Sequence, residues 1–223
     1  MAITLTRHDD VGLLTWSDGE NRINHDSLAR LNEILDELET IEGPLALVLT
    51  GDGKFFCNGL DLARFDPFSE EYESTFRELQ RTIGRVLVFP AYTVAAVNGH
   101  AFAGGALLAC AFDYRVMRED RGYWCVNEVE IGLALNEGMW SILANRVPRA
   151  TATRAALTAH RYGAPEALAH GIIDAVASVD QLVSHALAIA QSATSFDRKA
   201  IRYQKRVIHG DEAQHLGFDF LAD

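Results

Sequence analysis

Short apolar runs alternate with segments of helical periodicity in the first half of the chain, and this alternation limits the folds that the chain can adopt. Residues 45–49 and 93–97 are runs of buried-strand character, and residues 70–88 between them carry apolar side chains at helical spacing. Helices that alternate with strands pack on the faces of the sheet that the strands form. The sequence therefore predicts an α/β core.

The N-terminal segments add a strand pair and a helix to this core. Residues 3–7 and 11–16 are apolar or alternating runs separated by a polar turn, which predicts two antiparallel strands. Residues 26–38 have leucines three and four positions apart, the spacing of an amphipathic helix. Asp26 or Ser27 is the expected N-cap of that helix.

The second half of the chain is mainly helical in pattern. Residues 102–112 are almost entirely apolar and predict a buried helix, followed by a strand at 114–117. Beyond Gly138 we expect helices and one strand at 172–177. We therefore expect one α/β core over residues 1–178 and a helical C-terminal region over residues 179–223.

Composition and charge exclude several classes of protein. With 223 residues, 48% apolar and 23% charged, the chain has the make-up of a globular domain rather than of a disordered or fibrous protein. A net charge of −11 without a basic cluster of the size that a polyanion needs speaks against nucleic acid and anionic membranes as partners. The longest apolar run, residues 86–97, contains Pro90 and is too short to cross a bilayer. We expect a cytoplasmic protein.

The cysteines and histidines do not form a recognisable metal-binding or disulfide pattern. Cys57, Cys110 and Cys125 are an odd number of cysteines without a CxxC spacing, which indicates a reducing compartment. The eight histidines lack the spacing of known metal motifs. We expect no metal ion and no separate cofactor.

Two turns that contain glycine follow predicted strands, at residues 55–62 (FFCNGLDL) and 100–105 (HAFAGG). Backbone N–H groups at such turns lack partners, and two of them that face one point would form an oxyanion hole. Alternatively, Gly59 supplies a positive φ angle, while Gly104 and Gly105 allow close helix packing. Both interpretations are open from spacing alone.

Carboxylates in the segment WCVNEVEIGL (124–133) are candidates for a general base. Glu128 is surrounded by apolar residues, and an apolar environment disfavours the charged carboxylate and moves its pKa towards neutrality. Glu130, two residues later, would point to the same side of an expected strand and competes for the role. Either residue could instead lie on a solvated surface. Glu137 is a third carboxylate, which a helix dipole could equally well hold at a helix N-terminus.

Three ordered motifs resemble those of the crotonase superfamily, the enoyl-CoA hydratase/isomerase family. They are LALVLTGDGKFFCNGLDL at 45–62, PAYTVAAVNGHAFAGGALLACAFDYRVM at 90–117 and VNEVEIGL at 126–133, with a looser match at 156–176. The resemblance covers nearly the whole chain. It implies a crotonase fold, a spiral of ββα repeats whose helical C-terminal region assembles homotrimers or hexamers.

The resemblance also implies an acyl-CoA thioester as the substrate, with coenzyme A as part of it. The backbone N–H groups of Leu60 and Gly104 match the family's oxyanion hole for the thioester oxygen. The first motif matches the path of the CoA arm, with Arg64 a looser match. By this resemblance the residues expected to contact substrate or CoA are Lys54, Phe56, Cys57, Asn58, Gly59, Asp61, Leu62, Gly105 and Leu107.

The resemblance gives one clue to the reaction. Hydratases of this family use two glutamates; Glu128 matches one of them, and Leu107 stands where the other would be. Loss of one general acid–base group costs on the order of 10²–10⁴ in rate. A Δ3,Δ2-enoyl-CoA isomerase needs one base only, so we expect an isomerase with Glu128 as the proton shuttle.

The sequence leaves three alternatives open, which are another base, another reaction and a non-catalytic role. The segment LALNEGMW after Gly132 lacks the proline-containing loop of similar isomerases, and Glu137 beside Gly138 is the runner-up base because another isomerase branch places its base near an EG pair. An enoyl-CoA hydratase is the second candidate. A non-catalytic acyl-CoA-binding protein of the same fold is the third.

Overall fold

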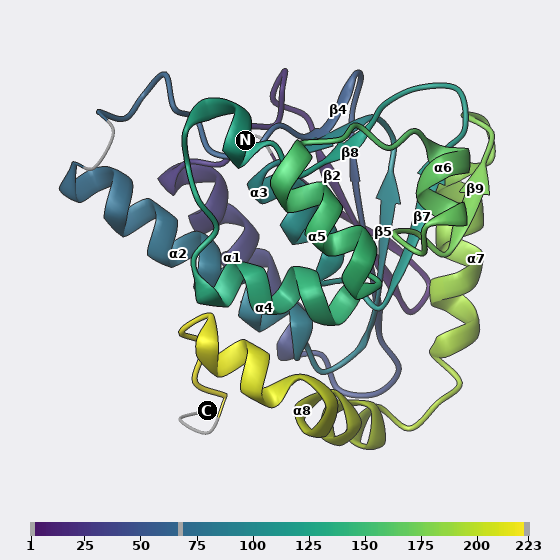
Figure 1. The fold of residues 1–223 in the computed structure, drawn as a ribbon. Coiled ribbons are helices and arrows are strands. Elements are labelled where there is room, and N and C mark those ends of the chain that lie inside the picture. Colours follow the sequence, from purple (N-terminus) through teal and green to yellow (C-terminus); the bar gives the residue numbers. More distant parts are fainter. Residues whose placement is uncertain (1–2, 67–68, 221–223) are drawn as a thin grey trace.

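The computed structural model describes residues 3–66 and 69–220, which form two mainly parallel sheets and a set of helices (Figure 1). The strands are β1 (Ile3–His8), β2 (Val11–Trp16), β3 (Ala46–Gly51), β4 (Phe55–Cys57), β5 (Tyr92–Val97), β6 (His100–Phe102), β7 (Tyr114–Arg118), β8 (Trp124–Cys125) and β9 (Ala175–Ala177). The helices are α1 (His25–Glu39), α2 (Glu70–Leu87), α3 (Gly104–Cys110), the 3₁₀ helix η1 (Glu128–Ile131), α4 (Glu137–Arg146), α5 (Arg149–Thr158), α6 (Ala164–Ala169), α7 (Leu182–Ala193) and α8 (Arg198–His215).

Between β3 and β8, consecutive strands alternate between the large sheet and the small sheet. The large sheet has the order β1-β2-β3-β5-β7-β9, and the small sheet has the order β4-β6-β8. The units β3-β4-α2 and β5-β6-α3 therefore have the same ββα pattern, and β7-β8-η1 repeats it with a shorter helix. This arrangement confirms the α/β class and the expected spiral of ββα repeats.

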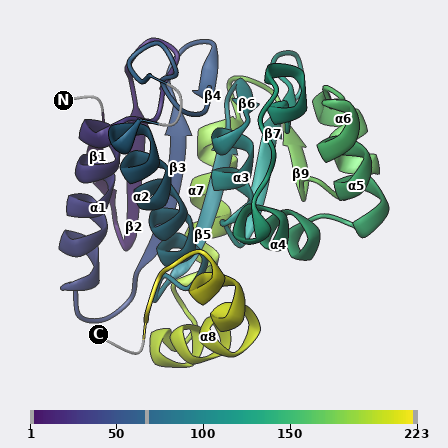
Figure 2. The same cartoon turned by 60° about the vertical axis from the view of Figure 1, so that its left-hand side comes forward.

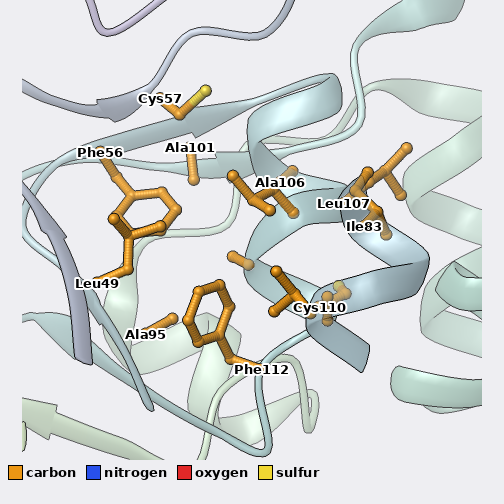
Figure 3. Packing of buried hydrophobic residues seen from close by; sticks show 14 of the residues in the cluster. Leu49, Phe56, Cys57, Ile83, Ala95, Ala101, Ala106, Leu107, Cys110 and Phe112 are labelled. Carbon is orange, nitrogen blue, oxygen red and sulfur yellow. The ribbon is translucent and has the colours of Figure 1, made fainter. Parts of the chain in front are cut away.

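Apolar side chains pack on both faces of the large sheet. On one face the core extends to the small sheet and α3, where Leu49, Phe56 and Phe112 point into the interior (Figure 3). On the other face α7 packs through Leu182, Ala186 and Ala190, and Figure 2 shows this helix behind the strands. Parallel strands that are covered on both faces need continuous apolar runs, which explains the composition of residues 45–49 and 93–97.

The packing of α7 changes the expected domain division. A boundary at residue 178 would separate α7 from the sheet that it covers, although α7 contacts β2, β3, β5, β7 and β9. The next helix, α8, packs against α2 and α4. The packed core therefore includes α7.

A buried ion pair attaches α8 to the rest of the molecule. Lys205 is 5% exposed, and its Nζ donates hydrogen bonds to Asp113 Oδ2 at 2.8 Å and to Ala91 O at 3.3 Å. The same Asp113 oxygen accepts hydrogen bonds from the backbone N–H and the hydroxyl of Thr93. Because both charges are buried and hydrogen-bonded, loss of either partner would leave the other uncompensated.

Several predicted elements are confirmed, and the differences have local causes. β1 and β2 pair in antiparallel fashion as expected. The N-cap of α1 is Asn24 and not Asp26 or Ser27, although Ser27 completes a capping box by bonding back to Asn24. The apolar helix begins at Gly104 rather than at Phe102, because residues 100–102 form β6. Within residues 3–66 and 69–220 no helix is long and apolar enough to cross a membrane.

Candidate active site

The turn after β4 presents the backbone of Leu60 towards the start of α3. Ile23 N–H donates to Gly59 O at 2.8 Å, and Asp61 N–H donates to Ile23 O at 2.9 Å. In such a parallel bridge the peptide groups of the intervening residue face away from the partner, so the Leu60 N–H is directed away from Ile23. Gly59 has a φ of +71°, a conformation that favours glycine.

The two glycine-containing turns meet at this point. A Cβ atom on Gly59 would lie 3.0 Å from Ala103 Cβ and 3.4 Å from Gly104 N. Gly104 is the first residue of α3, where the backbone N–H has no partner within the helix. The structure thus brings the Leu60 turn and the Gly104 helix start into contact, as two donors of one oxyanion hole require.

Gly105 and Ala103 support this helix start in different ways. A Cβ on Gly105 would lie only 2.3 Å from Cys57 O, so the absence of a side chain allows α3 to pack on β4. Ala103 has φ +48° and ψ −124°, a strained combination for a residue with a Cβ. The conformational and packing interpretation of the glycines is therefore confirmed for Gly59 and Gly105. The oxyanion-hole role of the Leu60 and Gly104 N–H groups stays a prediction.

Glu128 is the first residue of η1 and is held in an apolar environment. Burial raises the pKa of its carboxyl group from 4.5 to about 7, against a smaller lowering by its own backbone N–H. Its Oε2 is buried and has no hydrogen-bond partner in the described part of the chain. A carboxylate with a pKa near 7 can both accept and return a proton at neutral pH.

One cavity of about 730 Å³ joins these groups. It brings together six of the predicted positions, which are Leu60, Gly104, Leu107 and Glu128 together with Asn58 and Leu62 of the first motif. The other residues that line it are Arg22, Tyr72, Glu73, Phe76, Leu79, Ala103, Asn127, Ile131, Gly132, Leu133, Ala134, Leu135, Asn136 and Met139.

Several predicted contact residues lie elsewhere. Phe56 and Cys57 are 1% and 0% exposed in the core between the small sheet and α3, and neither lines the cavity (Figure 3). The ammonium group of Lys54 lies over the ring of Phe55, outside the cavity lining. Asp61 also lies outside that lining and pairs with Arg64 at 3.1 Å. These residues shape the turn rather than the cavity wall.

The two competing carboxylates also lie outside the cavity lining. Glu130 is exposed and pairs with Arg161 at 3.1 Å, because η1 is a 3₁₀ helix and not the expected strand with shared parity. Glu137 is exposed in the first turn of α4, while its neighbour Asn136 caps that helix and lines the cavity. Of these carboxylates only Glu128 reaches the same space as Leu60 and Gly104.

Sequence reasoning missed the contribution of α2 and of Arg22. Tyr72, Phe76 and Leu79 were assigned to a core-facing helix by their spacing, and the same face also forms one wall of the cavity. The spacing identified the face but not the neighbour that it meets. Arg22 gave no signal, because its place at the cavity depends on the bridge between Ile23 and Leu60.

The described residues contain no set of three or more histidine, cysteine, aspartate or glutamate side chains close enough to hold a metal ion. The three cysteines are buried and unpaired by disulfides. Burial raises the pKa of Cys57 to about 12, so its thiol is not a nucleophile. The cavity lining itself contains two carboxylates, Glu73 and Glu128.

Comparisons with known proteins show which family the chain resembles. The family model described as enoyl-CoA hydratase/isomerase matches residues 9–216. Enoyl-CoA delta isomerase 2, peroxisomal, of Arabidopsis thaliana is 33% identical over 184 residues, 78% of this chain and 76% of the relative. A putative enoyl-CoA hydratase of Thermus thermophilus is 35% identical over 207 residues, 90% of this chain and 80% of the relative.

Solved structures extend the likeness to the fold. A probable enoyl-CoA hydratase of Mycobacterium tuberculosis superposes with a TM-score of 0.90 at 26% identity, over 97% of this chain and 92% of that one. A second structure of that protein without ligand, described as an enoyl-CoA isomerase, gives a TM-score of 0.89 over 97% of this chain and 94% of that one. With a family model that spans most of its length and relatives that share its fold, the chain belongs to the enoyl-CoA hydratase/isomerase family.

Proposed function

We propose that this protein is an enoyl-CoA isomerase that moves the double bond of an acyl-CoA thioester from C3 to C2. The observation that carries the proposal is the pairing of Glu128 with an apolar residue at position 107. Glu128 is a carboxylate with a pKa near 7, and Leu107 is 1% exposed in the wall of the same cavity. One base with a dry, apolar neighbour suits proton transfer better than water addition.

In the proposed reaction the N–H groups of Leu60 and Gly104 bind the thioester oxygen. Ionised Glu128 takes a proton from C2 of a 3-enoyl thioester, and the electron pair of that C–H bond forms a dienolate whose negative charge lies on this oxygen. The protonated Glu128 then gives the same proton to C4, and the double bond becomes C2=C3. The atoms balance without water or an oxidant.

Hydration would need a second group to deprotonate and orient water. Leu107 cannot do so, and Glu73 is the remaining carboxylate in the cavity wall, on α2 rather than on α3. We therefore expect water addition to be slower than isomerisation by a factor on the order of 10²–10⁴. Leu107 would also keep water away from the dienolate.

The binding of CoA and self-association are further parts of the proposal. Arg22 and Asn58 are polar residues of the cavity lining close in sequence to the Leu60 turn or its bridge partner Ile23, which supports a CoA path along the first motif. Tyr203, Val207 and Ile208 are 60–67% exposed on α8, an apolar face that supports assembly into a homotrimer or hexamer.

The decisive experiment compares two isosteric substitutions in one cavity. Glu128→Gln should abolish conversion of a 3-enoyl-CoA to its 2-trans isomer, while Glu73→Gln removes the same charge and should retain conversion. Turnover close to wild type in Glu128→Gln would refute the assignment.

Two further measurements separate the alternatives. Wild-type protein that adds water to crotonyl-CoA at a rate comparable to its isomerisation would favour a hydratase, and Leu107→Glu would then change that rate little. A protein that binds CoA esters but exchanges no C2 hydrogen for deuterium in heavy water would be the non-catalytic member.

A further inference from the structure

The wall that α2 contributes to the cavity starts beside the proposed oxyanion hole. A Cβ atom on Gly104 would lie 2.9 Å from Leu79 Cδ2, so Leu79 is in contact with the helix start that binds the thioester oxygen. From Leu79 the same face of α2 runs back through Phe76 to Tyr72, and all three residues line the cavity. At 1.5 Å per residue these positions span about 10 Å along the helix.

Aromatic and aliphatic side chains form this wall, and Glu73 is the charged residue that α2 adds to the cavity lining. The rings of Tyr72 and Phe76 are nearly parallel, with centroids 6.1 Å apart and an interplanar angle of 3°. Tyr72 is 8% exposed, and burial is the main cause of the raised pKa of its hydroxyl. The facing wall, between η1 and α4, is also largely apolar and consists of Ile131, Leu133, Ala134, Leu135 and Met139.

The position of Glu128 sets the direction of the bound chain. Glu128 and Tyr72 line the same cavity, and the contact of Leu79 with the Gly104 position places the thioester end of the substrate at the Leu79 end of the wall. Glu128 has to reach C2 and C4, whereas Arg22 and Asn58 stand by the Leu60 turn, where the CoA arm enters. Carbons beyond C4 therefore continue from Glu128 towards Phe76 and Tyr72.

We infer that the enzyme acts on straight, apolar acyl chains of about eight to ten carbons and disfavours short ones. An extended chain advances about 1.3 Å per carbon, given C–C bonds of about 1.5 Å. The wall of about 10 Å from Leu79 to Tyr72 thus covers about eight steps from the thioester carbon. A four-carbon chain would leave most of this wall without contact. The inference rests on the proposed isomerase function.

The test is a series of trans-3-enoyl-CoA substrates with 6, 8, 10, 12 and 16 carbons. Each methylene that the wall buries should raise kcat/KM by up to about fourfold, so that ten carbons exceed six by on the order of a hundredfold. The value should then level off. A maximum at six carbons, a flat series, or a rise that continues to sixteen carbons would overturn the inference and leave the isomerase assignment intact.

A matched pair of variants tests the wall itself. Phe76→Gln should lower the ratio of kcat/KM between ten and six carbons by about tenfold or more, because the amide replaces an apolar contact beyond C4. Leu157→Gln, a substitution at a residue 71% exposed on α5, should leave that ratio unchanged. An unchanged ratio in Phe76→Gln would contradict the inferred path, and no conversion at any chain length would refute the proposed function instead.

Discussion

The raised pKa of Glu128 predicts that this residue opposes folding at neutral and alkaline pH. In the folded protein its pKa is about 7, whereas a glutamate in water has a pKa of 4.5, because burial disfavours the charged form. Each pKa unit corresponds to about 1.4 kcal/mol, so the ionised carboxylate costs about 3 kcal/mol of folding free energy. Glu128→Gln removes the charge and should recover that amount.

The sign of the effect fixes the pH window. Below pH 4.5 both the folded and the unfolded states hold the proton, and ionisation contributes nothing to the difference between wild type and variant. As the pH rises from 4.5 to about 7, the unfolded state loses the proton first, and the wild type loses stability relative to Glu128→Gln. Above that range the full difference of about 3 kcal/mol is present.

Urea unfolding of both proteins at pH 4.5 and pH 8, at one fixed protein concentration, measures this difference. Glu130→Gln is the matched control, since it removes an exposed carboxylate from the same 3₁₀ helix. Its stability relative to wild type should differ between the two pH values by less than about 1 kcal/mol. A Glu128→Gln difference that is equal at pH 4.5 and pH 8 would refute the reasoning.

Three further predictions concern the general base, the strained residue before α3 and the buried ion pair of α8. The kcat/KM of isomerisation should rise through a pKa of about 7 as Glu128 loses its proton, and a pH–rate profile that is flat from pH 5 to 8 would contradict this. Ala103→Gly should stabilise the protein by about 1 kcal/mol in denaturant unfolding, since it relieves the strain at φ +48°, and a destabilised variant would show that the backbone there is not strained. Lys205→Met should destabilise the protein by about 3 kcal/mol by leaving Asp113 buried and unpaired, an effect that Lys199→Met, at the exposed start of α8, should not reproduce.

Local patterns predicted much of the fold because they record contacts within single elements. The spacing of leucines in 26–38 and the apolar runs of β3 and β5 reflect one buried face or two, whatever element lies opposite. The sequence does not predict β4 and β6 as strands, because they have only three residues each, and it places β8, of two residues, in a longer strand. Such segments are too short to show a period, and only their pairing identifies them.

The sequence by itself determined the order of the main elements, the two glycine-containing turns and the presence of leucine at position 107, because these depend on residues close together in the chain. Tertiary structure alone decided that Gly59 meets Gly104, that Glu128 and not Glu130 or Glu137 enters the cavity, and that Tyr72 and Phe76 form its wall. These juxtapositions arise where consecutive ββα repeats stack, and the pKa of Glu128 follows from the burial that this stacking creates. A pattern within one element shows which face is buried, and the stacking of the repeats shows what that face contacts.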